Sequence, residues 1–201
     1  MSVGASTVSQ NDGMRIAIIE AARELFAKFG YKKTTMEDIA QALRKGKSSL
    51  YYYFTNKEEI FQAVIEQEES ILFTQLQEVV GSDLSPKDKL KEYVMTRMET
   101  ISSLENYLKA LKDEMMGGYE FLDKLKGKAE KEEANLLTSI LEEGTEDNTF
   151  QVKNIPMAAV AIAISLRGLE VPLFKSVKDF NEFKVQIENI LNILFFGLIK
   201  R

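Results

Sequence analysis

The sequence predicts an all-α fold in which three short N-terminal helices are joined by a long helix to a larger helical region. Apolar residues recur every three or four positions along almost the whole chain, which is the spacing of one helix face. Residues that favour helix starts and helix ends separate these stretches. No stretch shows the alternation of apolar and polar residues that is typical of a half-buried strand.

The N-terminal part predicts three helices in close succession. The first covers about residues 13–29, and Gly30 follows it, where a left-handed helix end is expected. The segment Thr35-Met36-Glu37-Asp38 resembles a capping box, with a hydroxyl residue followed three positions later by a carboxylate, and it opens a second short helix. After the polar residues 44–46, the segment 48–54 predicts a third short helix that Leu50 and Phe54 anchor.

The rest of the chain predicts longer helices. One opens at Asn56-Lys57 and runs to Val80, and the segment 86–143 predicts two or three more with a break near residues 117–118. A loop at 144–154 precedes a helix from Pro156 to about Phe174, and the last helix begins near Asp179. We therefore expect a flexible tail at 1–12, a first domain at 13–57 and a second at 58–201.

The composition excludes several functional classes. The chain has no cysteine and no histidine, so disulfides, thiolate metal sites and the commonest general bases are excluded, and we expect no cofactor and no metal. Charged clusters such as 66–69 and 131–133 are expected to be solvated helix faces, so the chain is not expected to be an enzyme. The two longest apolar runs, 157–166 and 190–199, are shorter than the roughly 20 residues that a membrane crossing needs. The start of the chain does not resemble a signal peptide, and we expect a cytoplasmic protein without a membrane partner.

The charge is distributed unevenly. The total is −5, yet residues 12–57 carry nine Lys/Arg against five Asp/Glu, a net +4, which leaves −9 on residues 58–201. Chance clustering explains this pattern about as well as function does. A basic head on an acidic body is nevertheless suited to local binding of phosphates.

Two short helices with a tight turn between them, preceded by a third, form a helix-turn-helix unit of the kind that enters the major groove of DNA. Hydroxyl residues crowd the segment after the turn: Ser48, Ser49, Tyr51, Tyr52 and Tyr53. Their hydroxyls can reach phosphates, and the tyrosine rings can contact base edges and thymine methyl groups. Packing against the first helix is the alternative role for each tyrosine.

Residues 14–65 resemble the DNA-binding region of the tetracycline-repressor (TetR) family. The resemblance rests on separately spaced segments: Met-Arg-Ile-Ala-Ile-Ile-Glu-Ala-Ala from Met14, Phe-Gly-Tyr, Thr-Thr-Met-Glu-Asp-Ile-Ala, and Ser-Ser-Leu-Tyr-Tyr-Tyr-Phe-Thr-Asn-Lys-Glu-Glu-Ile. The remainder adds a faint likeness in Glu142-Glu143-Gly144 with Phe150, and in Leu166-Arg167-Gly168-Leu169.

The resemblance implies roles for individual residues. Thr35 would bind a phosphate from the start of the second helix, and Lys57 would hold another. Lys47, Ser48 and Ser49 would face the groove at the start of the recognition helix, with Tyr51 and Tyr53 on backbone or bases. Tyr52 alternates away from these two and is not assigned a contact.

The turn departs from the family pattern. The family commonly has Gly-Val-Ser where this chain has Arg44, Lys45 and Gly46. A left-handed residue at Arg44 would cost roughly 1 kcal/mol relative to glycine. Either the turn takes another shape, or these cations lie along DNA.

The last two predicted helices suggest a homodimer. They are apolar on more than one face, so they need a partner beyond their own domain, and the alternative is one large core within a monomer. The expected interface residues are Ala159, Ala163, Ile187, Leu191, Leu194 and Leu198.

Residues 86–125 are rich in methionine and aromatic residues, and the resemblance implies that a pocket for a small apolar ligand lies there. The candidates for its lining are Tyr93, Met98, Tyr107, Met115 and Phe121. Ordinary core packing is the alternative for each of them. Arg97 can pair with an acid group of a ligand or with an acidic residue of the chain.

The sequence therefore predicts a DNA-binding transcriptional regulator with an operator, a second copy of itself and an unidentified apolar ligand as partners. A repressor that its ligand releases from DNA is the first hypothesis. A constitutive DNA-binding protein without a ligand is the second, and a helical enzyme is the third.

Overall fold

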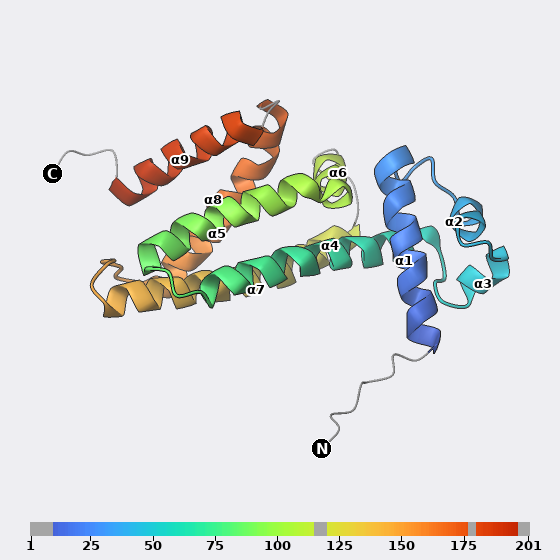
Figure 1. The fold of residues 1–201 in the computed structure, drawn as a ribbon, viewed down its shortest axis with the longest axis horizontal. Helices are drawn as coiled ribbons and strands as arrows, with labels where there is room; N and C mark the ends of the chain where they lie inside the picture. Colours follow the sequence, from blue (N-terminus) through green and yellow to red (C-terminus); the bar gives the residue numbers. More distant parts are fainter. Residues whose placement is uncertain (1–9, 115–119, 177–179, 197–201) are drawn as a thin grey trace, which may run out of the picture. The chain divides into compact units, whose positions relative to one another are not determined.

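The structure, a computed structural model, describes residues 10–114, 120–176 and 180–196, and within them it leaves aside the side chains of 10–11, 111–127, 170–183, 190 and 194–196. Throughout these ranges the regular structure is helical, and the predicted all-α class is confirmed (Figure 1). Two compact units divide the chain, residues 1–68 and 69–201. The predicted boundary at 57/58 lies at the start of helix α4 (Lys57–Val80), whereas the two units meet within that helix.

The first unit contains α1 (Gln10–Phe29), α2 (Met36–Ala42), α3 (Lys47–Tyr51) and the start of α4. Gly30 ends α1 with a φ of +84°, a conformation that costs glycine little, as the sequence predicts. The core of the unit is formed by Ile18, Ala22, Phe26, Ile39, Leu50, Phe54 and Ile60, all almost fully buried. Aromatic rings join α1 to the start of α4. The Phe26 and Phe61 rings meet edge to face, with their centres 5.3 Å apart.

The turn between α2 and α3 is a Schellman motif built on an arginine. Arg44 has a φ of +53°. Its N–H donates to the carbonyl of Gln41 at 3.0 Å, and the N–H of Lys45 donates to that of Ala40 at 2.9 Å. Arg44 thus adopts the left-handed backbone conformation that usually favours glycine. Both cations are exposed, so this shape leaves them available to solvent or to DNA.

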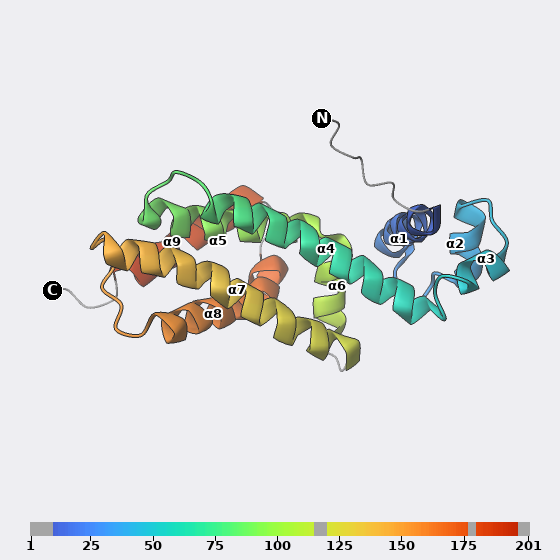
Figure 2. The same cartoon turned by 90° about the horizontal axis from the view of Figure 1, so that it is seen from below.

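The second unit contains the end of α4 with α5 (Pro86–Ser103), α6 (Glu105–Glu114), α7 (Glu120–Glu146), α8 (Ile155–Ser176) and α9 (Phe180–Phe196). Ser85 caps α5 by accepting the N–H of Asp88 at 3.2 Å, and Pro86 occupies the first turn, as predicted. Helix α7 packs along α8, and α5 packs against both α7 and α9 (Figure 2). The predicted break at 117–118 lies outside the described residues.

Helix α7 runs past Gly144, where the sequence predicts a loop, and ends at Glu146. Gly144 is required there by packing: a Cβ at this position would lie 2.2 Å from a ring carbon of Phe150. The N–H of Phe150 also donates to the Gly144 carbonyl at 2.7 Å. The ring therefore closes the helix end against the bare backbone. This contact explains why glycine and phenylalanine occur at this spacing.

Among the described residues, no helix is both long enough and apolar enough to cross a membrane.

Candidate DNA-binding site

The start of α2 is fixed by the capping box that the sequence predicts. The Thr35 hydroxyl oxygen accepts the N–H of Asp38 at 3.2 Å, and the Asp38 carboxylate accepts the N–H of Thr35 at 2.8 Å. The Thr35 hydroxyl also donates to this carboxylate at 2.7 Å, and these bonds from Thr35 hold the pKa of Asp38 below its usual value. Thr35 is exposed, but its hydroxyl proton is committed to Asp38. A phosphate contact from Thr35 stays a prediction.

Helix α3 turns its polar residues outward because Leu50 anchors its inner face. Leu50 is fully buried, while Lys47, Ser48 and Tyr51 are exposed and Ser49 is half-buried. The Lys47 ammonium lies 3.8 Å from the Glu37 carboxylate and 6.0 Å from the centre of the Tyr51 ring. Cationic and hydroxyl groups thus share one exposed helix face, which is the arrangement that major-groove reading requires.

The three tyrosines after Leu50 differ in exposure. Tyr52 is the most exposed at 74%, against 48% for Tyr51, and Tyr53 is half-buried. The Tyr52 and Tyr53 rings meet edge to face at 4.9 Å. The helix ends at Tyr51, short of the predicted Phe54, so helical spacing does not determine the direction of Tyr52. The high exposure of Tyr52, the most accessible ring of the three, could therefore not be predicted from helical spacing.

Lys57 connects the first turn of α4 to the loop between α1 and α2. Its ammonium donates to the carbonyls of Tyr31 at 2.7 Å and of Thr34 at 2.8 Å, and it lies 4.2 Å from the centre of the Tyr31 ring. Burial lowers the pKa of Lys57. An ammonium has three donors, so two are used within the protein. The predicted phosphate contact of Lys57 stays a prediction, and the structure adds a role in positioning the loop.

A hollow of about 480 Å³ lies in the first unit between α1 and α2. It is lined by Leu25, Phe29, Lys33, Thr34, Asp38, Gln41 and Ala42. None of these residues belongs to the predicted ligand pocket.

The predicted pocket residues lie in the second unit. Tyr93, Met98 and Tyr107 are all buried. Met115 lies outside the described residues, as does the side chain of Phe121. Burial is equally consistent with core packing, so the pocket stays a prediction.

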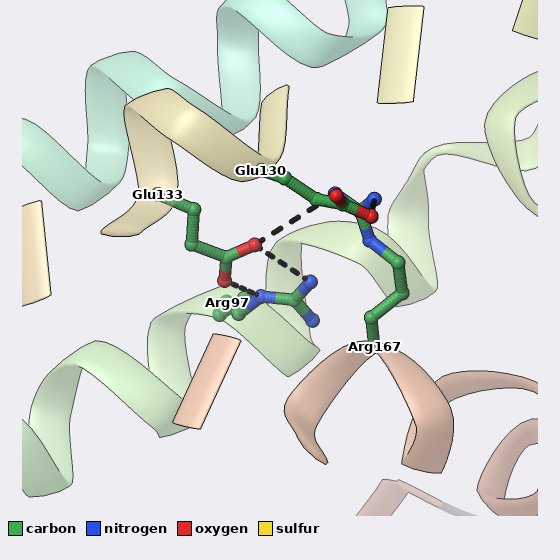
Figure 3. A network of polar contacts seen from close by, with 4 residues as sticks. All are labelled: Arg97, Glu130, Glu133 and Arg167. Carbon is green, nitrogen blue, oxygen red and sulfur yellow. Dashed lines mark hydrogen bonds and ion pairs between the residues drawn. The ribbon is translucent and has the colours of Figure 1, made fainter. Parts of the chain in front are cut away.

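Arg97 makes an ion pair within the protein, which is one of its two predicted roles. Its Nε and Nη2 donate to the carboxylate of Glu133, and both side chains are almost fully buried. Arg167 lies near the same carboxylate, with its Nη2 4.0 Å from Oε2 (Figure 3). Arg97 is the one arginine of α5, but the sequence does not identify its partner 36 residues away. The prediction that 131–133 is a solvated helix face is wrong for Glu133, because this carboxylate packs inward against Arg97.

The predicted dimer residues are buried within the single chain. Ala159, Ala163, Ile187 and Leu191 are each at most 3% exposed, so they have little surface to offer a second copy. The Leu194 side chain and Leu198 lie outside the described residues. Other apolar residues of α8 and α9 are exposed instead: Met157, Val160, Ile164, Val185 and Ile193.

The first unit thus defines a class, that of helix-turn-helix DNA-binding regulators. Residues 18–64 match the family model for bacterial regulatory proteins of the tetR family. The HTH-type transcriptional repressor KstR2 of Mycolicibacterium smegmatis is 28% identical over 150 residues, which cover 72% of this chain and 71% of that protein.

Solved structures extend the likeness to most of the chain. A transcriptional regulator from Cytophaga hutchinsonii is 27% identical, with a TM-score of 0.80 over 92% of this chain and 98% of its own. FadR from Bacillus subtilis has the same fold at 20% identity, with a TM-score of 0.73 over 92% of this chain and 99% of its own. The N-terminal part of the chain, residues 18–64, thus matches the tetR family of bacterial regulatory proteins, and the predicted class of DNA-binding transcriptional regulator is confirmed.

Proposed function

We propose that this protein is a homodimeric repressor that binds operator DNA through α3 and leaves it when a small apolar ligand binds the second unit. The observation that carries the proposal is the exposed face of α3, where Lys47, Ser48 and Tyr51 stand away from the buried Leu50. KstR2, the relative described above, is itself a repressor, which favours repression over activation. Such a protein would act in the cytoplasm, where the DNA is.

Tyr52 joins this face in the proposal because of its exposure. Ser49 and Tyr53 are half-buried and would contribute through whatever part of their side chains reaches the surface. Arg44 and Lys45 are exposed in the preceding turn and would contact phosphates. Contacts of this kind position the protein, whereas those from Ser48 and Tyr51 would read bases.

Selection of bound fragments from genomic DNA, followed by binding titrations, tests this part. Lys57→Ala is expected to weaken binding to all sequences, and substitution of Ser48 is expected to change sequence preference more than affinity. Recovery of no enriched fragment from a folded protein would contradict operator binding.

Dimerisation would use the exposed apolar residues of α8 and α9 rather than the buried ones. Met157, Val160 and Ile164 recur at helical spacing on α8, so they lie on one face. A two-fold dimer presents two recognition helices, and these read half-sites about one helical turn apart. The residues named here replace Ala159, Ala163, Ile187 and Leu191 as the proposed contacts.

A charge in this face tests the interface. Ile164→Glu is expected to give monomers at micromolar concentration by native mass spectrometry, because the carboxylate would be desolvated without a partner. Leu84→Glu is the control, since Leu84 is also exposed but lies in the loop before α5. An unchanged dimer for Ile164→Glu would exclude this surface.

The ligand would bind among the helices of residues 60–175. FadR, a protein of the same fold, is known in complex with stearoyl-CoA. Helix α4 has residues in both compact units, so it is the proposed route by which binding in one unit affects the other. A coupling of typical size would weaken operator binding roughly 5- to 150-fold, and operator DNA would weaken ligand binding by the same factor. Equal ligand affinity with and without operator would favour a constitutive DNA-binding protein.

A further inference from the structure

An ion pair lies in the core of the second unit, between α5 and α7. Arg97 is 1% exposed and Glu133 is 3% exposed. The guanidinium donates through Nε to one carboxylate oxygen and through Nη2 to the other at 3.3 Å. Fully buried residues follow one turn later on each helix, namely Ile101 on α5 and Leu137 on α7.

Stability alone does not account for this pair. Removing two charges from water costs about as much as their attraction returns, and apolar residues of similar volume often stabilise a core equally well or better. A buried pair of this kind is best attested where it serves specificity or a switch.

A second arginine gives Glu133 another possible partner. Arg167 on α8 lies with Nη2 4.0 Å from Glu133 Oε2, while its Nη1 donates to Glu130 at 2.7 Å. Figure 3 shows both guanidinium groups next to the Glu133 carboxylate, with Nη2 of Arg97 and Nη2 of Arg167 directed at the same oxygen, Oε2. Glu130 is half exposed, so it can exchange Arg167 for water at little cost.

A tyrosine hydroxyl completes the cluster. Tyr93 lies one turn before Arg97 on α5 and is fully buried, and its hydroxyl forms no hydrogen bond to any described residue. Burial raises the pKa of Tyr93, and the nearby charge of Glu133 raises it further, although no hydrogen bond of ordinary geometry joins the two groups. A buried donor without an acceptor is costly, and a ligand oxygen would satisfy it.

We propose that Tyr93, Arg97, Glu133 and Arg167, here the Arg97 cluster, bind the carboxylate of an apolar monocarboxylic acid. This inference rests on the ligand-released regulator proposed above and specifies its ligand class. In the ligand-free protein, the Glu133 carboxylate occupies the place of the ligand's carboxylate on Arg97. When the acid binds, it takes over Arg97 and accepts a hydrogen bond from Tyr93, and Glu133 moves to Arg167. Exchange of one carboxylate for another keeps every buried charge paired.

The exchange changes which helices are joined. Glu133 belongs to α7, so its transfer replaces a link from α7 to α5 with a closer link from α7 to α8. The ligand therefore acts on the packing of three helices of the second unit through one side chain. This is the kind of two-state element that ligand control requires.

The experiment uses the full chain and a panel of apolar monocarboxylates, such as octanoate and 4-phenylbutyrate, each matched with its uncharged primary amide. Calorimetric titration is expected to show that the acids bind at least about tenfold more tightly than the amides. Tyr93→Phe is expected to lose affinity for the acid and keep the fold, because it removes a hydroxyl that has no partner. Glu133→Gln is expected to gain at least about tenfold in acid affinity, because the competing carboxylate is gone.

Glu143→Gln is the matched control, since Glu143 also joins α7 to α5, through Lys89 at 2.7 Å. Its acid affinity is expected to equal that of the unmodified protein. Equal binding of acids and amides, or failure of every acid to bind Glu133→Gln, overturns the ligand class. Operator binding is measured separately on the same samples. Loss of operator binding in every sample contradicts the proposed function, whereas normal operator binding with no acid effect contradicts only this inference.

Discussion

The two compact units differ in the exposure of the polar residues that we propose for binding. In the first unit they are exposed: Lys47, Ser48, Tyr51 and Tyr52 surround an anchor, Leu50, that is fully buried. In the second unit they are buried, as Arg97, Glu133 and Tyr93 are. Exposed hydroxyls and cations suit a large charged partner, whereas buried ones suit a small molecule that is desolvated as it binds. The comparison teaches that the two proposed sites differ in kind: the one for DNA is an exposed helix face, and the one for a ligand is a buried cluster.

The largest expected effect comes from removing the anchor of the DNA-reading helix. Leu50→Ala is expected to destabilise the first unit by about 2–5 kcal/mol, because it deletes buried methyl groups and leaves a cavity. Denaturant unfolding with a probe in each unit measures the loss. Leu137→Ala removes an equally buried leucine from the second unit and is the matched variant. If Leu50→Ala lowers the stability of both units equally, the division into two units is not reflected in their energetics.

Gly144 offers a test within the second unit alone. Gly144→Ala is expected to cost about 1–3 kcal/mol, because its Cβ would overlap the Phe150 ring. Adding Phe150→Ala should make the double variant less unstable than the two single losses combined, since the clash is gone. Gly168→Ala in α8 is the control, as nothing lies within 4 Å of a Cβ there. If the stability losses of the two single variants simply add, contact with the Phe150 ring is not the reason why position 144 requires glycine.

Arg44 is expected to lower the stability of the first unit and to strengthen its binding to DNA. Arg44→Gly is expected to stabilise the first unit by about 1 kcal/mol, since φ is +53° there. The same change is expected to reduce the slope of log affinity against log salt concentration by about one, which corresponds to one lost phosphate contact. Arg44→Asn, which tolerates the left-handed region while lacking the charge, separates conformation from charge. An unchanged salt dependence in both variants would exclude Arg44 from the DNA contact.

The smallest expected effects are the lowered pKa values of two carboxyls, one in each unit. Hydrogen bonds from Thr35 lower the pKa of Asp38 in the first unit, and those from Thr149 lower the pKa of Asp147 in the second. A carboxyl with a lowered folded pKa stabilises the protein above its unfolded pKa, about 3.9, and this contribution is lost as the pH falls through the folded pKa. Carbon NMR titration is expected to place both midpoints below the ordinary value. Midpoints at or above that value would show that these bonds do not persist in solution.

Much of the first unit could be predicted because its signals are local. The capping box at Thr35, the glycine at the end of α1 and the apolar anchors depend on residues a few positions apart. Tyr52 was missed because α3 ends one residue before it, and helical spacing no longer applies. The additional role of Lys57 in positioning the loop before α2 could not be predicted, because its carbonyl partners, Tyr31 and Thr34, are distant in sequence.

In the second unit the helices and a ligand pocket were predicted, but the pairing of its charged residues was not. Its decisive contacts join different helices, as Arg97 and Glu133 do, and no local pattern shows which residues pair. The same limit affected the dimer interface. Ala159 and Leu191 are apolar at helical spacing, but only the packed structure shows that this face is buried within the chain.

The most direct test of the account compares exposed residues of the two units in one operator titration. The triple variant Lys47→Ala, Tyr51→Ala, Tyr52→Ala removes three exposed side chains next to the buried Leu50. The control, Lys91→Ala, Lys109→Ala, Lys128→Ala, removes three exposed cations of the second unit. At about 1–3 kcal/mol for each contact, fluorescence anisotropy on the selected operator should show at least about 100-fold weaker binding for the first variant. Binding by the control should stay within about threefold of the unmodified protein, since these exposed cations belong to the other unit and salt screens their charges. A folded first variant that binds the operator as tightly as the control would contradict the assignment of DNA reading to α3.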